Sequence, residues 1–323
     1  MKENRGGRRR RGREIVPVAA CALGLELLLS VPAQAASPQF AYSEEKWASL
    51  KDNTLEFEEI ADLIHEYNST VKKNALEYKD YKGKDSDEIA QTYYDTADEI
   101  YASIEYPDSD ASNYGSLLAS AQSSELSADQ MMEKGDENVA DADVKLWGYT
   151  KTEKTLVQTA QNQMISYWNA VISLESKRNA VEKAQTSMET AQKKLAAGTG
   201  TQTDVLTAQE SLYNAQAAVT TAESTIAATK ESLCLSLGWS YGSEVEIKAL
   251  PEPAESYSST VNLEEDIAKA VENNYDLMIL NREVKNARVG TVQREYELSL
   301  ESSKEAVKSS VQSAYQSLLL AET

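Results

Sequence analysis

The apolar residues on either side of Gly200 form two series that mirror each other. Each series repeats every seven residues, and each member before Gly200 has a counterpart at the same distance after it. An apolar repeat of seven predicts a helix that packs along one seam against a second helix, with a left-handed supercoil. The mirrored order predicts that the two helices run antiparallel. The seam residues are Tyr167, Leu174, Val181, Met188 and Leu195 before the turn, and Val205, Leu212, Val219, Ile226 and Leu233 after it.

The residues between the two series are of the kinds that end one helix and begin the next. Gly198 can adopt the positive φ that commonly follows the last residue of a helix. Thr201 stands at an N-cap position with Asp204 three residues later, the spacing of a capping box, and Asp204 places negative charge at the positive end of the second helix dipole. The segment therefore predicts an αα-hairpin. Its tip comprises Gly198, Gly200, Thr201, Asp204 and Val205.

The composition favours a mostly helical protein. The 323 residues include only 13 glycines and 6 prolines, with 41% hydrophobic and 7% aromatic residues, so the chain is lean in helix breakers. A formal net charge of −20 disfavours nucleic-acid binding, because no basic stripe is present to replace phosphate counterions. We therefore predict an all-α fold of elongated, antiparallel coiled-coil hairpins.

Residues 1–35 have the features of a secretion signal. Arginines come first, an apolar run follows from Ile15 to Val31, and a small-x-small cleavage site ends at Ala35. We expect the mature chain to begin near Ala36 and to be exported to the cell envelope. The segment ending at Cys21 looks like a lipoprotein box but lies early in the apolar run, so lipid anchoring there is the less favoured alternative. Cys234 is then the single remaining cysteine, and we interpret it as a small apolar residue near the seam.

The rest of the chain divides into four parts. Within them we also predict a joint between two helices near Asn68 and a continuous helix over residues 281–312. The parts are N-terminal helices and polar loops (36–138), a long coiled-coil hairpin (139–238), a crossing linker (239–258) and the start of a second repeat (259–323).

Two segments near the C-terminus echo earlier ones, which indicates an internal repeat. Residues 263–277 echo residues 55–71, and residues 311–322 echo residues 164–175 at a constant offset. The second repeat stops part of the way along its first long helix. We therefore expect a two-repeat protein in which the second repeat is truncated.

The hairpin tip, the heptad seam and the tandem repeat together resemble the TolC-like outer-membrane efflux protein family. The pattern from Gly198 through Thr201 to Asp204 is similar to that family's tip, and residues 270–277 are similar to the helix that opens each of its repeats. The resemblance implies a homotrimer that forms an α-helical tunnel, the family's α-barrel. It also implies that the tip binds a periplasmic adaptor (membrane fusion) protein, which links it to an inner-membrane pump. Asp204 would then lie near the constricted entrance of the tunnel.

The sequence departs from the family in one respect. Each repeat of the family contributes two membrane strands with alternating apolar and polar residues, whereas residues 82–138 read as polar helices and loops. Outer-membrane insertion is therefore less well supported than the helical tunnel, and an extracytoplasmic location without it stays open.

The residues favour no enzymatic chemistry. His65 is the single histidine, so a histidine metal site or a Ser-His-Asp triad is disfavoured. The acidic stretch from Asp108 to Asn113 begins like a calcium loop but lacks its later glycine and glutamate. We interpret the seventeen tyrosines mainly as packing residues. We predict no catalytic residues, no cofactor and no metal, and an efflux or secretion channel component; the alternative is a non-channel envelope scaffold or adaptor-like interaction protein.

Overall fold

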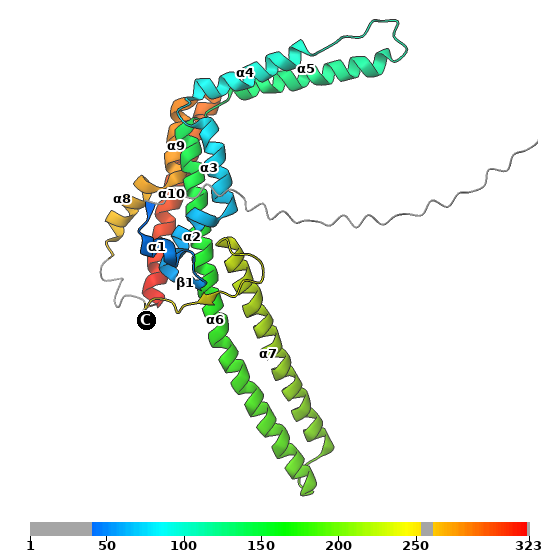
Figure 1. Cartoon of the computed structure of the whole chain (residues 1–323), viewed down its shortest axis with the longest axis vertical. Coiled ribbons are helices and arrows are strands. Elements are labelled where there is room, and N and C mark those ends of the chain that lie inside the picture. The colour runs from blue at the N-terminus through cyan, green and yellow to red at the C-terminus, as the bar shows by residue number, and fades with distance from the viewer. Residues whose placement is uncertain (1–40, 253–260, 322–323) are drawn as a thin grey trace, which may run out of the picture. The chain divides into compact units, whose positions relative to one another are not determined.

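The computed structural model describes residues 41–252 and 261–321, all within the unit Ala36–Thr323. The predicted secretion signal and Cys21 lie outside these residues, as does part of the predicted crossing linker. The described elements, most of them labelled in Figure 1, are α1 (Glu44–Ser49), β1 (Thr54–Leu55), the 3-10 turn η2 (Phe57–Glu59), α2 (Ile60–Tyr67), α3 (Ser69–Tyr81), α4 (Ser86–Ala102), α5 (Tyr114–Asp136), α6 (Ala142–Ala196), α7 (Gln202–Ser236), β2 (Glu246–Ile247), α8 (Leu263–Asn273), α9 (Tyr275–Asn286) and α10 (Gly290–Ala321).

The described chain is almost entirely helical, which confirms the all-α prediction. The longest helix, α6, has 55 residues and would extend about 80 Å at the usual rise per residue. A five-residue turn joins it to α7, which has 35 residues and packs back along it (Figure 1). α4 and α5 pack together as a second helical hairpin. Residues 82–138 therefore contain helices and loops, as the sequence predicted.

The hydrophobic core lies where the middle of α6 meets α2, α3 and the end of α7. Leu55, Ile60 and Ile64 are fully buried there, and they pack with Met164 of α6 and Leu233 of α7. Burying a large aliphatic side chain completely contributes about 1.5 to 3 kcal/mol. This core therefore holds the base of the α6–α7 hairpin in place.

A two-residue parallel pairing closes one side of the core. Thr54 and Leu55 of β1 pair with Glu246 and Ile247 of β2, and the side chain of Trp168 on α6 donates a hydrogen bond to the carbonyl of Lys248 at 2.9 Å. The crossing linker was predicted without a strand, so this pairing is an addition to the sequence analysis.

The joint near Asn68 is confirmed. Asn68 has an extended backbone, and its side-chain oxygen accepts from the N–H groups of Thr70 and Val71, so it ends α2 and caps α3. Its side-chain nitrogen also donates to the carbonyl of Ser236 at 2.8 Å. This one asparagine thus fixes both a helix start and the end of α7.

The prediction of one continuous helix over residues 281–312 is wrong, because the chain breaks between α9 and α10. Asn286 donates to the carbonyl of Val139 at 2.9 Å, and Arg288 donates to the carbonyl of Gly135 at 3.1 Å and to Asp87. Ala287 between them is extended. Hydrogen bonds to residues far away in the sequence therefore override the local helical preference.

Candidate functional site at the hairpin tip

The turn between α6 and α7 closes by backbone hydrogen bonds. Gly198 has φ of 71°, the left-handed conformation that glycine adopts at lowest cost. The N–H of Gly198 donates to the carbonyl of Leu195 at 3.0 Å, and the N–H groups of Thr199 and Gly200 both donate to the carbonyl of Lys194, at 2.9 and 3.1 Å. The last carbonyls of α6 are therefore satisfied within the turn itself.

The predicted capping box at the start of α7 forms. The Thr201 hydroxyl accepts from the N–H of Asp204 at 3.2 Å, while the Asp204 carboxylate accepts from the N–H and the hydroxyl of Thr201, both at 2.8 Å. These hydrogen bonds, the one from the Thr201 backbone first, lower the pKa of Asp204. The turn is thus ordered by its own groups.

The side chains beside the cap point in different directions. Val205 is 9% exposed, whereas the neighbouring Leu206 is 56% exposed and Tyr213, two turns further along α7, is 61% exposed. Val205 therefore belongs to the packed side of α7. Leu206 and Tyr213 place apolar surface on its outer side, close to the tip.

The structure places the predicted seam residues at the less exposed positions of the two helices. Leu174, Val205 and Leu233 are buried, and the rest are half-buried, while most residues between them are exposed. The half-buried ones are Tyr167, Val181, Met188 and Leu195 on α6, and Leu212, Val219 and Ile226 on α7. This alternation is the pattern of two helices that share one narrow apolar contact.

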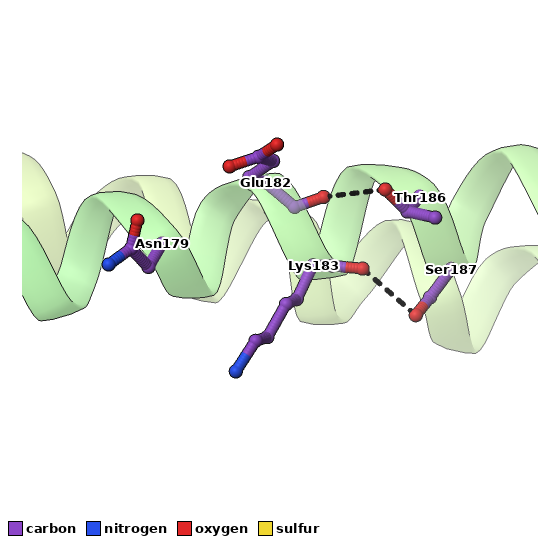
Figure 2. A pocket seen from close by; sticks show the side chains of 5 residues that line it. All are labelled: Asn179, Glu182, Lys183, Thr186 and Ser187. Carbon is purple, nitrogen blue, oxygen red and sulfur yellow. Dashed lines mark hydrogen bonds between the residues drawn. The ribbon is translucent and has the colours of Figure 1, made fainter.

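A shallow groove follows α6 up to the tip, in two parts that share Thr186 and Ser187. The part farther from the tip, shown in Figure 2, is an open surface of α6 alone, formed also by the exposed residues Asn179, Glu182 and Lys183. The part nearer the tip has about 480 Å³. It adds Thr190, Ala191, Lys194, Thr199, Gly200 and Asp204 to the lining.

The hydroxyl groups of this groove are occupied as donors. Thr186 donates to the carbonyl of Glu182 and Ser187 to that of Lys183, each at 3.0 Å, as Figure 2 shows. Their oxygens can still accept hydrogen bonds, and Lys183 and Glu182 add one charge of each sign. The groove is therefore polar and carries charges of both signs.

The other residues considered for chemistry lie elsewhere. His65 on α2 contacts Glu153 of α6 at 3.0 Å, and the hydrogen bond to Glu153 raises its pKa. Cys234 is buried in the core as a free thiol, and burial raises its pKa, so its interpretation as a packing residue is confirmed. In the part of the chain that the structure describes, no group of three or more His, Cys, Asp or Glu residues is placed to hold a metal ion.

The sequence analysis missed a buried polar joint at the start of α6. Asp141 is 2% exposed and its carboxylate accepts from the N–H of Val144 at 2.9 Å, from Arg282 at 2.5 Å and from Asn286 at 2.8 Å. Burial by itself would raise the pKa of Asp141, but these hydrogen bonds outweigh it and lower the pKa. The joint ties the start of α6 to α9.

A second missed feature is a ladder of tyrosine–carboxylate hydrogen bonds to α5 from α4 and from the loop that follows α4. Tyr94 donates to Asp136 at 2.9 Å, Tyr101 to Asp129, and Tyr106 to Glu125 at 3.1 Å. The hydrogen bond to Asp129 raises the pKa of Tyr101 to about 12. The ladder gives three of the seventeen tyrosines a hydrogen-bonding role beside the packing role that was predicted, and its signal in the sequence was the register of three tyrosines against three carboxylates.

Two further observations complete the description of the molecule. Among the described helices, none combines the length and the apolar character needed to cross a bilayer. Comparison of the chain with protein-family models, with curated proteins and with solved structures gave no match.

Proposed function

We propose that this chain is a TolC-like component of an efflux or secretion conduit in the cell envelope. The observation that carries the proposal is the α6–α7 hairpin, whose base is fixed in the core and whose turn satisfies its own backbone groups. A long hairpin with one apolar seam and an exposed outer side is suited to packing beside other hairpins. In the proposal, three copies assemble so that their hairpins line a helical tunnel.

The tip is the proposed docking site for a periplasmic adaptor protein, which in turn engages an inner-membrane pump. Gly198, Gly200 and Thr201 present backbone and small side chains, so a partner helix can approach closely. Leu206 provides exposed apolar surface next to them. A few apolar anchors within a polar rim are typical of protein interfaces, which supports the tip and the adjoining groove as the contact region.

A second candidate function is a non-channel envelope scaffold. The α4–α5 hairpin favours it, because this hairpin is helical where the family resemblance implies strands, and because it is held by the tyrosine–carboxylate ladder as a structure of its own. In this role the two hairpins would be binding arms, and no conduit would form.

The molar mass of the purified mature chain, residues 36–323, separates the two candidates. Sedimentation equilibrium in mild detergent should give three times the mass of one chain if the conduit proposal is correct. Leu206→Asp and Tyr213→Asp, on the outer side of α7, should shift the protein toward monomer, while the matched variant Leu126→Asp, on the exposed side of α5, should not. A stable monomer at all concentrations would overturn the conduit and favour the scaffold.

A further inference from the structure

The α4–α5 hairpin has an interface of its own. Among the described helices, α4 and α5 pack on each other and on no other helix to a comparable extent. The interface contains the small buried residues Ala90 and Ala97 of α4 and Ala121, Ala128 and Gly135 of α5. None of these residues belongs to the core formed by α2, α6 and α7. The ring of Tyr94 lies so close to Gly135 that an added Cβ would be 2.2 Å from it. The hairpin is therefore a rigid unit that does not rely on the main core.

Two short segments join the hairpin to the rest of the chain, and we call them its root (residues 82–86 and 137–141). The N–H of Ala142, at the start of α6, donates to the carbonyl of Lys84 at 3.0 Å. The side-chain nitrogen of Asn138, a residue that is 9% exposed, donates to the carbonyl of Ser86 at 2.8 Å. The two segments are therefore tied to each other and to the start of α6, so the root can serve as a pivot.

The hairpin carries a large negative charge. Residues 85–137 contain 14 Asp and Glu residues and one Lys, and the remaining residues of the chain are net negative as well. Two units of like charge repel each other, so the hairpin needs an opposite charge to hold it near the rest of the chain. Of the ion pairs between described residues, the one that joins the hairpin to another part of the chain is formed by Asp87 and Arg288.

Arg288 contacts both helices of the hairpin just beyond the root. Its guanidinium donates to Asp87 in the first turn of α4 and to the carbonyl of Gly135 in the last turn of α5, the latter at 3.1 Å. A cation is favourable at this end of α5, because the helix dipole is negative there. The planar guanidinium has donors that point in different directions, so one side chain can hold both helices.

The segment that carries Arg288 is itself fixed to α6. Arg288 follows the break between α9 and α10, and Asn286, two residues earlier, donates to the carbonyl of Val139 at 2.9 Å and to the carboxylate of Asp141 at 2.8 Å. These bonds hold the end of α9 at the start of α6. Arg288 therefore reaches the hairpin from a fixed position.

We infer that Arg288 is a clasp that holds the α4–α5 hairpin in one orientation, and that the hairpin rotates as a rigid unit about its root when the clasp opens. The clasp is suited to opening, because the side chains of Asp87 and Arg288 are 80% and 32% exposed, and exposed ion pairs are weak and screened by salt. The interface between α4 and α5 involves no such pair and stays closed. Ionic strength therefore shifts the hairpin between its two states. This inference does not depend on the proposed conduit.

Double electron–electron resonance between two nitroxide labels measures this rotation. Ser120→Cys places one label on α5 and Lys154→Cys places the other on α6, and both positions are exposed. Cys234 is 2% exposed, and the chain without added cysteines controls for its labelling. Labelled chain 36–323 is diluted with unlabelled chain, which removes distances between copies. Arg288→Ala should widen the distance distribution about twofold or more, as expected for a freed hinge.

Salt gives a second measurement. At 1 M salt the Debye length is about 3 Å, so the distribution of the wild type should widen, while that of Arg288→Ala should change little. Asp87→Asn removes one of the two acceptors and should give an intermediate width. Arg294→Ala is the matched control, because Arg294 pairs with Glu297 on its own helix, and it should leave the distribution unchanged.

Hydrogen exchange distinguishes rotation of the hairpin from its unfolding. The inference predicts that α4 and α5 are equally protected in the wild type and in Arg288→Ala. An unchanged distance distribution in Arg288→Ala, an equal widening in Arg294→Ala, or a loss of protection along the whole of α4 and α5 would each overturn the inference.

Discussion

Removal of the Asp141 carboxylate should destabilise the protein more than any surface charge change. In Asp141→Ala, α6 loses its N-cap acceptor, which costs about 1 kcal/mol. The side chains of Asn286 and Arg282 lose an ionised acceptor, and hydrogen bonds to charged groups contribute about 1.5 to 3 kcal/mol. Arg282 is 38% exposed in its side chain and also lies 3.5 Å from Asp143, so water and Asp143 recover part of this loss. We expect a total of about 3 kcal/mol.

Urea unfolding followed by circular dichroism measures this loss. Asp141→Asn keeps a capping oxygen but loses the charge, so its free energy of unfolding should lie between those of Asp141→Ala and the wild type. Asp143→Ala is the matched control, because its side chain is 52% exposed and its loss should change stability by less than about 0.5 kcal/mol. Hydrogen exchange should show the loss of protection in the first turns of α6 and in α9.

The same carboxylate predicts a direction of pH dependence. Its pKa is lowered in the folded protein, so its contribution to stability is present above the ordinary aspartate pKa of about 3.9 and is lost as the pH falls through the lower, folded value. Asp141→Asn should remove this part of the acid sensitivity. If Asp141→Ala and Asp143→Ala have equal free energies of unfolding, the reasoning about the joint is refuted.

Three further predictions concern the tip, the core and the ladder. Thr201→Ala should cost about 1 kcal/mol through the lost cap and increase hydrogen exchange at the start of α7 alone, and exchange that spreads through the core would contradict this. Gly238→Ala should cost more than about 2 kcal/mol by thermal unfolding, because Gly238 has φ of 97° and an added Cβ would lie 2.3 Å from Cβ of Tyr67; a neutral effect would show that the contact is not tight. The pKa of Tyr101 is about 12 in the folded protein and about 10 in the unfolded chain. The stabilisation that Tyr101 gives the α4–α5 hairpin is therefore fully present below about pH 10 and is lost as the pH rises through about 12. The pKa of Tyr42 is also about 12, so spectrophotometric titration of Tyr101→Phe should show a smaller phenolate step near pH 12 that corresponds to one tyrosine fewer, and an unchanged titration would disprove the ladder.

Local features of the hairpin could be predicted from the sequence because the interactions that fix them are local. Gly198, Thr201 and Asp204 contact residues within a few positions of themselves, and the heptad pattern specifies which side of each helix is packed. The joint at Asn68 is of the same kind, because the asparagine caps the helix that directly follows it.

Features that depend on distant residues could not be predicted in this way. The break at Ala287 follows from the hydrogen bonds that Asn286 and Arg288 donate to the carbonyls of Val139 and Gly135, which are far away in the sequence. The pairing of β1 with β2 involves two residues on each side, too few to show an alternating pattern. The Asp141 joint brings together residues more than 140 positions apart, and each of them has the sequence context of an ordinary solvated polar residue.

Conductance is the most direct test of the proposed conduit. The purified mature chain, residues 36–323, would be added to planar lipid bilayers and single-channel currents recorded, with Asp204→Ala measured in parallel. The account predicts discrete conductance steps for the wild type and altered gating for Asp204→Ala, since Asp204 would lie at the tunnel entrance. Absence of any conductance from a protein that is folded by circular dichroism would contradict the account.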